Sequence, residues 1–141
     1  MQLTKNFTLA ELTKTSQPLP NVPNEAEIAR LKALAVNILQ PLRDALGRPV
    51  ILTNAFRSEA VNRAVGGVAS SQHRNGEAAD IYVNGLNPLQ LAQYIHSLRL
   101  PYDQLIREPT WVHVSYHEAG RRQLLTVRHV EGRAVYSPGL S

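Results

Sequence analysis

The chain has 141 residues, a hydrophobic fraction of 43% and a formal net charge of +4 at pH 7. This length is most simply one domain with a single core, and the composition argues against general disorder. There is no cysteine, which excludes disulfides and thiolate metal sites. No apolar run is long enough to cross a bilayer or to act as a signal peptide, so we expect synthesis in the cytoplasm and no membrane insertion.

The first half of the chain predicts two helices joined by an irregular link. A capping-box pattern favours a short helix over residues 8–12. Three prolines indicate an extended connection over residues 16–24. Apolar side chains then recur with helical period over residues 25–46, where Pro41 should kink the helix and Gly47 should end it.

The second half predicts strands alternating with short helices. We expect a strand over residues 49–56, a helix over 58–65, a loop over 68–77, a strand over 77–83 and a helix over 88–98. Four further strands are expected: 102–107, 111–116, 123–130 and 134–136, the last two forming a terminal hairpin. The pattern predicts an α+β fold with helices packed on one face of a small, mainly antiparallel sheet.

Two histidines and one aspartate beside predicted strands are the main chemical candidates. His73 precedes Asn75-Gly76, a dipeptide that favours a turn because both residues tolerate positive φ. Asp80 and His113 each lie on the face of a strand opposite its apolar residues. Two imidazoles and one carboxylate are the ligand set of a catalytic zinc with one position left for water. The other histidines fit less well: His96, His117 and His129.

The stretches SQHRNGEAAD (71–80), WVHVS (111–115) and TNAFRS (53–58) carry a family resemblance. They resemble motifs of the zinc D-Ala-D-Ala carboxypeptidase family, which includes short phage-type endolysin peptidases. The resemblance covers roughly residues 7–117. It implies a single zinc peptidase domain over residues 1–141, with the zinc cleft on the sheet face opposite the helices and a terminal hairpin and tail at 118–141.

The same resemblance implies one zinc ion per chain, with three ligands: His73, Asp80 and His113. In the family, a general base that takes a proton from water stands shortly upstream of the last histidine, and Glu108 is our choice for this role. The spacing departs from a common one, because Thr110 stands three residues before His113. Asp103 and Glu118 are kept as alternatives, although Asp103 could instead cap local backbone.

Four further residues are candidates for contact with a substrate. Arg57 is expected either to stabilise the negative oxygen of a tetrahedral intermediate or to bind a substrate carboxylate. Ser71 and Gln72 flank His73 and could form hydrogen bonds with a substrate backbone. Trp111 either walls the cleft or packs against its neighbours.

These features predict a zinc metallopeptidase that hydrolyses a peptide bond in the stem or cross-link of bacterial peptidoglycan. It would be a phage-type endolysin or a D-Ala-D-Ala carboxypeptidase-like enzyme, and spacing does not distinguish an endopeptidase from a carboxypeptidase. We expect a monomer that reaches the wall through a holin-like lesion or as part of a phage particle. One alternative is a catalytically silent, zinc-containing module that binds a cell-wall peptide.

The positive charge leaves another alternative, a basic nucleic-acid-binding domain, because basic chains attract anionic polymers. Its arginines are scattered along the sequence, and two Phe and one Trp offer few surfaces on which bases could stack. We therefore expect a peptidoglycan peptide, and no nucleic acid, as the partner.

Overall fold

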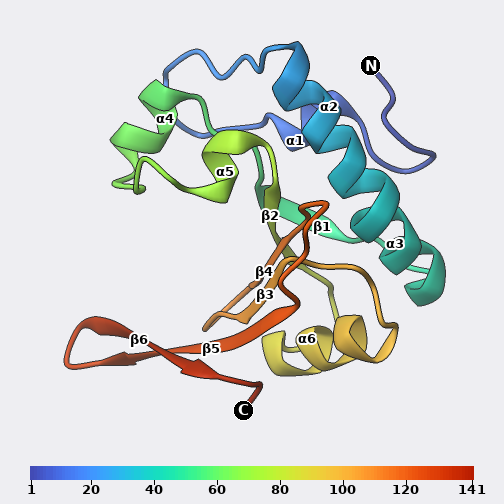
Figure 1. Ribbon diagram of the computed structural model, residues 1–141, viewed down its shortest axis with the longest axis vertical. Coiled ribbons are helices and arrows are strands. Elements are labelled where there is room, and N and C mark those ends of the chain that lie inside the picture. The colour runs from blue at the N-terminus through green and yellow to red at the C-terminus, as the bar shows by residue number, and fades with distance from the viewer.

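The computed structural model describes residues 1–141. Its amino-terminal part holds α1 (Leu9–Leu12), α2 (Glu25–Leu34), the π-helical segment η1 (Ala35–Leu39) and α3 (Gln40–Leu46). The last three run on as one long helix (Figure 1), which confirms the helix predicted over residues 25–46. It ends as expected at Gly47, whose φ of 67° lies in the left-handed region.

The disturbance expected at Pro41 is the π-helical segment that immediately precedes α3. A proline inside a helix offers no N–H, and its ring crowds the carbonyl four residues back. Widening the preceding turn relieves that crowding, so the helix passes through Pro41 without ending.

The remaining elements alternate as predicted. They are β1 (Ile51–Asn54), α4 (Glu59–Ala64), α5 (Gln72–Asn75), β2 (Ala78–Tyr82), α6 (Pro88–Ser97), β3 (Gln104–Arg107), β4 (Val112–Ser115), β5 (Gln123–Val130) and β6 (Arg133–Pro138). The prediction of a loop over residues 68–77 was wrong in part, because α5 forms one helical turn there. Ser71 caps this turn by accepting a hydrogen bond from the backbone N–H of His73. A four-residue helix is too short to show a hydrophobic period, so the sequence pattern misses it.

The six strands form one sheet in the order β1-β2-β4-β3-β5-β6, and the pairing of β3 with β5 is its one parallel pairing. This confirms the mixed α+β fold with a mainly antiparallel sheet. One face of the sheet shares a buried core with the long helix and α6: Ala79, Ile81, Leu105, Val112 and Val114 pack with Leu31, Leu34, Ile38, Leu42, Leu91 and Ile95.

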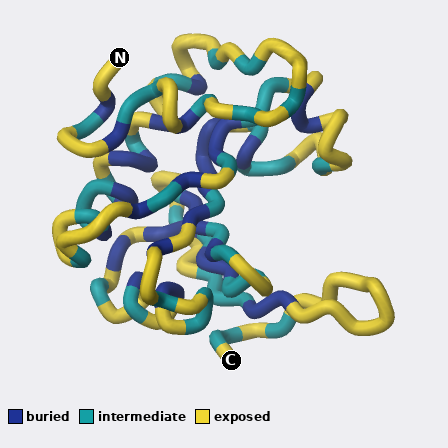
Figure 2. Tube along the Cα trace, turned by 180° about the vertical axis from the view of Figure 1, so that it is seen from behind, coloured by how far each residue is buried: buried dark blue, intermediate teal, exposed yellow.

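The candidate site lies on the opposite face of the sheet, which the long helix and α6 do not cover. Figure 1 shows α4 and α5 on the same side of the molecule as the projecting β5–β6 hairpin, with the other strands between them. Figure 2 shows the same arrangement from behind, with the tip of the hairpin exposed. No helix combines the length and apolar character that crossing a membrane would require.

Candidate active site

A single row of paired residues crosses the open face of the sheet from edge to edge. In strand order from β1 to β6 it runs through Asn54, Asp80, His113, Ile106, Leu125 and Pro138. Residues paired across neighbouring strands point to the same face. The four middle residues of the row, Asp80, His113, Ile106 and Leu125, form the floor of a cavity of about 550 Å³. All the first-choice candidates from the sequence line this cavity: Arg57, Ser71, Gln72, His73, Asp80, Glu108, Trp111 and His113.

Two imidazole nitrogens and one carboxylate oxygen meet on this floor. The Nε2 atom of His73 and the Nδ1 atom of His113 each lie 3.2 Å from Oδ1 of Asp80. The three side chains offer ligand atoms that all lie within 4.8 Å of one another. On the far side of its ring, Nδ1 of His73 lies 2.7 Å from the carbonyl oxygen of Ala55. Because a carbonyl only accepts, the ring proton belongs on Nδ1, which leaves the lone pair of Nε2 facing the site.

The charge of Asp80 is maintained by its neighbours. Burial alone would raise the pKa of this carboxyl, but the imidazoles of His113 and His73 beside it outweigh burial and hold the pKa below its ordinary value. The site thus combines an ionised carboxylate with two imidazoles on the wall of an open cavity. This donor set fits zinc with a free position on the cavity side.

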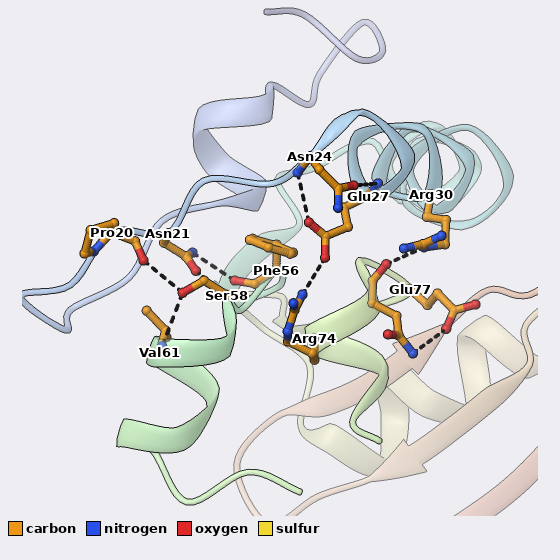
Figure 3. A network of polar contacts seen from close by, with 11 residues as sticks. Pro20, Asn21, Asn24, Glu27, Arg30, Phe56, Ser58, Val61, Arg74 and Glu77 are labelled. Atoms are coloured by element: carbon orange, nitrogen blue, oxygen red, sulfur yellow. Dashed lines mark hydrogen bonds and ion pairs between the residues drawn. The ribbon is translucent and has the colours of Figure 1, made fainter. Parts of the chain in front are cut away.

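The helical turn that carries His73 is tied to the long helix. Arg74 forms an ion pair with the largely buried Glu27 of α2, and Nε of Arg30 donates a hydrogen bond of 2.6 Å to the carbonyl oxygen of Asn75 (Figure 3). Gly76 ends the turn with a φ of 79°, and a Cβ atom there would lie 2.9 Å from the carbonyl oxygen of Glu27. The close approach of α5 to α2 therefore requires glycine at this position.

Arg57 is held at the rim of the same cavity by two asparagines. Its Nη1 donates to Oδ1 of Asn62 at 3.1 Å. The amide oxygen of Asn54, when turned toward the guanidinium, accepts from Nε and Nη2 at 3.0 Å each. Burial lowers the pKa of Arg57 and the charge of Asp80 opposes that effect, so the guanidinium stays positive next to the site. The sequence analysis missed the two asparagines, because their contacts with Arg57 depend on how the segment between β1 and α4 folds.

Glu108 and Asp80 are the two carboxylates that line the cavity. Glu108 follows β3, and its backbone N–H donates to the carbonyl oxygen of Trp111 at 3.1 Å, which closes the turn into β4. Burial, and then the negative charge of Asp80, raise the pKa of Glu108, while His113 opposes them. A half-buried carboxylate with this surrounding has the character of a proton acceptor.

The alternative carboxylates lie elsewhere. Asp103 does not line the cavity; it accepts hydrogen bonds from Nε and Nη2 of Arg121, at 3.1 and 2.9 Å, and from Nε2 of Gln72 at 2.7 Å. It also accepts a hydrogen bond of 2.8 Å from the backbone N–H of Arg121. Asp103 thus binds local backbone, which the sequence analysis gave as the alternative to a catalytic role. Glu118 borders two other surface pockets. Neither residue is placed to act on a substrate in the main cavity.

The three remaining histidines also lie outside the cavity. His96 is 2.8 Å from the hydroxyl of Tyr102, His117 is 3.8 Å from the carboxylate of Glu77, and His129 is exposed on β5. The sequence had offered no partner for His96, because a tyrosine six residues further on is not a helical neighbour.

The buried Asp103 makes stability depend on pH. Hydrogen bonds from Arg121 hold its pKa at about 2, against an ordinary value of 3.8. The pair therefore stabilises the folded chain above pH 3.8, and this contribution is lost as the pH falls toward 2. We expect Asp103→Asn to lower the free energy of unfolding by about 1–2 kcal/mol at pH 7, after allowance for the exposed Arg121, and by much less at pH 2.

Urea denaturation of both proteins at the two pH values measures this difference. The matched control is Glu59→Gln, which breaks an exposed ion pair with Arg63 and should cost about 0.5 kcal/mol or less. An equal effect of Asp103→Asn at pH 7 and pH 2 would contradict the assignment.

The carboxyl-terminal hairpin also contributes to the cavity, which the sequence did not indicate. Gln123 and Leu125 of β5 and Tyr136 of β6 line it. The parallel pairing of β3 with β5 brings them there, with Leu125 opposite Ile106. No local sequence pattern predicts that β3 pairs with β5, because β4 lies between them in the chain.

Comparison with known proteins agrees with this site. The sequence model of the Peptidase M15 family matches residues 5–115. A zinc D-Ala-D-Ala carboxypeptidase of Streptomyces albus G is 37% identical over 90 residues, which cover 62% of this chain and 35% of that protein. The chain thus matches about a third of the length of this curated relative. The matched range contains His73, Asp80, Glu108 and His113, and the match confirms the resemblance predicted from the motifs. The chain belongs to the Peptidase M15 family.

Proposed function

We propose that this chain is a zinc metallopeptidase that hydrolyses a peptide bond in the peptide part of bacterial peptidoglycan. The observation that carries the proposal is the meeting of His73, Asp80 and His113 on the floor of a cavity whose one further carboxylate is Glu108. The similar protein from Streptomyces albus G is named as a zinc D-Ala-D-Ala carboxypeptidase, which supports both the metal and the class of substrate.

Glu108 and Arg57 have separate roles in the proposed reaction. A bound zinc would polarise the scissile carbonyl and make a water molecule acidic enough to lose its proton near neutral pH. Glu108 accepts that proton and later passes it to the leaving amine. Arg57, fixed by Asn54 and Asn62, stabilises the negative charge that develops on the carbonyl oxygen.

Ser71, Gln72 and Trp111 form the wall near these groups and are proposed to contact the substrate. Ser71 caps α5 and Gln72 begins it, just before the ligand His73. The amide group of Gln72 is oriented by Asp103. The Oε1 atom of Gln72 is buried and has no hydrogen-bond partner in the chain. A small shift of this side chain toward the cavity that it lines would let Oε1 accept an N–H group of a peptide.

Digestion of purified peptidoglycan, followed by mass spectrometry of the fragments, tests the proposal. We expect new amino and carboxyl ends within the stem or cross-link peptides, no products after treatment with a chelator, and recovery of the products when zinc is restored. Binding to the wall without any cleavage would instead identify the zinc-containing binding module. Absence of both zinc and wall binding would overturn the proposal altogether.

The position of Arg57 gives a sharper test through Gly67. A Cβ atom on Gly67 would lie 2.1 Å from Oδ1 of Asn62 and 2.7 Å from Nη1 of Arg57. Gly67→Ala should therefore displace the guanidinium without touching a metal ligand. We expect turnover to fall about ten- to a hundredfold, with the zinc content unchanged. Turnover of released peptide and metal analysis on the same preparation measure the two effects.

The control for Gly67→Ala is Val65→Ala, which shortens an exposed side chain in the same segment and should leave turnover unchanged. Normal turnover in Gly67→Ala would show that the placement of Arg57 does not matter for the reaction.

We further propose delivery as a phage-type endolysin, released by a membrane lesion that another protein makes. The net charge of +4 supports attraction to the anionic wall. Expression inside bacteria with and without a pore-forming protein tests this, because lysis should require both. Lysis by the chain alone would contradict the proposed route.

A further inference from the structure

The strand order places Arg57 and Glu108 at different ends of the cavity. Arg57 follows β1, Asp80 and His113 lie on β2 and β4, and Glu108 follows β3. Arg57 and Glu108 therefore lie on opposite sides of the candidate metal ligands. In the proposed reaction Glu108 protonates the leaving amine, so the leaving part of the substrate lies on the Glu108 side. The strands beyond it are β5 and β6, which form the hairpin.

The pairing register of β3, β5 and β6 extends the floor of the cavity from Glu108 to this hairpin. Arg107 pairs with Thr126, so one further step along β3 and β5 brings Glu108 opposite Val127. Val127 pairs in turn with Tyr136 on β6. Neighbouring strands lie about 4.8 Å apart, which puts the Cα atoms of Glu108 and Tyr136 about 10 Å apart on the same face. Two long side chains can cover that distance between them.

Tyr136 presents an aromatic ring that is not part of the hydrophobic core. Its side chain lines the cavity together with Leu125, yet the residue remains 57% exposed. Burial, and then the charge of Glu108, raise the pKa of Tyr136, which is consistent with a hydroxyl close to that carboxylate. A large exposed aromatic in the wall of a cavity is typical of a binding surface.

Two further observations concern the size of the ligand. The family match ends at residue 115, so Leu125 and Tyr136 belong to a part of the chain outside it. β6 is the last strand of the sheet, and the hairpin projects from the rest of the molecule (Figures 1 and 2). No strand lies beyond Tyr136 to limit the length of a peptide that passes over it.

We propose that Tyr136 and Leu125 form the subsite for the leaving part of the substrate, and that this subsite accepts a leaving peptide of two or more residues. The inference rests on the proposed peptidase function. Leu125 supplies an apolar floor, and the ring of Tyr136 packs against the aliphatic part of the leaving peptide. The hairpin is in this way a specificity element that directs the enzyme toward internal peptide bonds.

The test compares two probes isolated from digested peptidoglycan. One is a disaccharide-pentapeptide, whose terminal cleavage releases a single amino acid. The other is a cross-linked dimer, whose cleavage within the cross-link releases a longer peptide. We expect the wild-type protein to cleave the dimer with the higher kcat/KM. We expect Tyr136→Ala to raise KM for the dimer about tenfold while kcat stays within about twofold, since the contact lies away from the reacting bond.

Three variants keep this result interpretable. Tyr136→Phe retains the ring and should keep KM within about twofold of the wild-type value. Tyr82→Ala removes another exposed tyrosine of the same sheet that does not line the cavity, and Val135→Ala alters the opposite face of the same hairpin. Both should behave as the wild type, and circular dichroism spectra should be the same for all variants.

The outcomes separate this inference from the proposed function. If the wild type cleaves neither probe, the peptidase proposal fails and the subsite with it. If the wild type cleaves the dimer but Tyr136→Ala does so with unchanged KM, the reaction stands and the subsite is overturned. Preference of the wild type for terminal cleavage of the pentapeptide, with release of a single amino acid, also overturns the subsite as proposed, as does a defect in Tyr136→Phe as large as that in Tyr136→Ala.

Discussion

Glu108→Gln should reduce turnover at least about a hundredfold while the zinc content stays at the wild-type level. The substitution keeps the size of the side chain and its contacts with the cavity wall, but an amide does not accept a proton from water. Because Glu108 is not among the three converging ligand atoms, the metal should remain. The loss should appear in kcat, since substrate binding depends on other parts of the wall. Turnover of a purified wall fragment and metal analysis measure the two quantities.

Glu118→Gln is the matched control for this experiment. It makes the same chemical change in an exposed carboxylate that borders other pockets, and turnover should be unchanged. Near-normal turnover of Glu108→Gln, with zinc present, would mean that another group acts as the base.

His73→Ala should abolish both zinc binding and turnover. Its Nε2 is one of three donor atoms at the site, and an alanine offers no replacement. The loss of affinity should exceed the roughly 10–100-fold effect of removing an outer-shell partner of a metal ligand. A folded protein that binds zinc gains about 2.7 kcal/mol of stability when free zinc is present at a hundred times its dissociation constant. The wild type should therefore melt at a higher temperature with zinc, whereas His73→Ala should show little shift.

His129→Ala is the control for the loss of one imidazole. This histidine is exposed on β5 and outside the cavity, so zinc content, thermal shift and turnover should match the wild type. One zinc per chain in His73→Ala would show that the ligand set is different.

The sequence predicted those parts of the molecule that local patterns determine. Helical periodicity predicted the long helix, and the residue types of Gly47 and Pro41 predicted its end and its disturbance. Alternation placed Asp80 and His113 on the polar faces of their strands, and the structure makes the two residues direct register partners. Their motifs also predicted a resemblance to the zinc D-Ala-D-Ala carboxypeptidase family, which the Peptidase M15 match confirms.

What the sequence missed depends on contacts between distant segments. Asn54 contacts Arg57 only three residues further on, but the position of Arg57 depends on a distant residue, since its backbone N–H donates to the carbonyl oxygen of His73. A lone asparagine carries no sign of this. The turn α5 is too short for a hydrophobic period, and it depends on its contacts with α2. Tyr136 reaches the cavity through a parallel pairing of β3 with β5, and side-chain alternation alone does not reveal the partner of a strand.

The attachment of α5 to α2 has a consequence for the energetics of the metal site. Glu27, which contributes no donor atom, fixes through Arg74 the turn that carries one. Ion affinity and the cohesion of the amino-terminal third of the chain are therefore thermodynamically linked. Metal binding therefore stabilises that third of the protein, and a substitution that destabilises the long helix lowers the affinity for the ion.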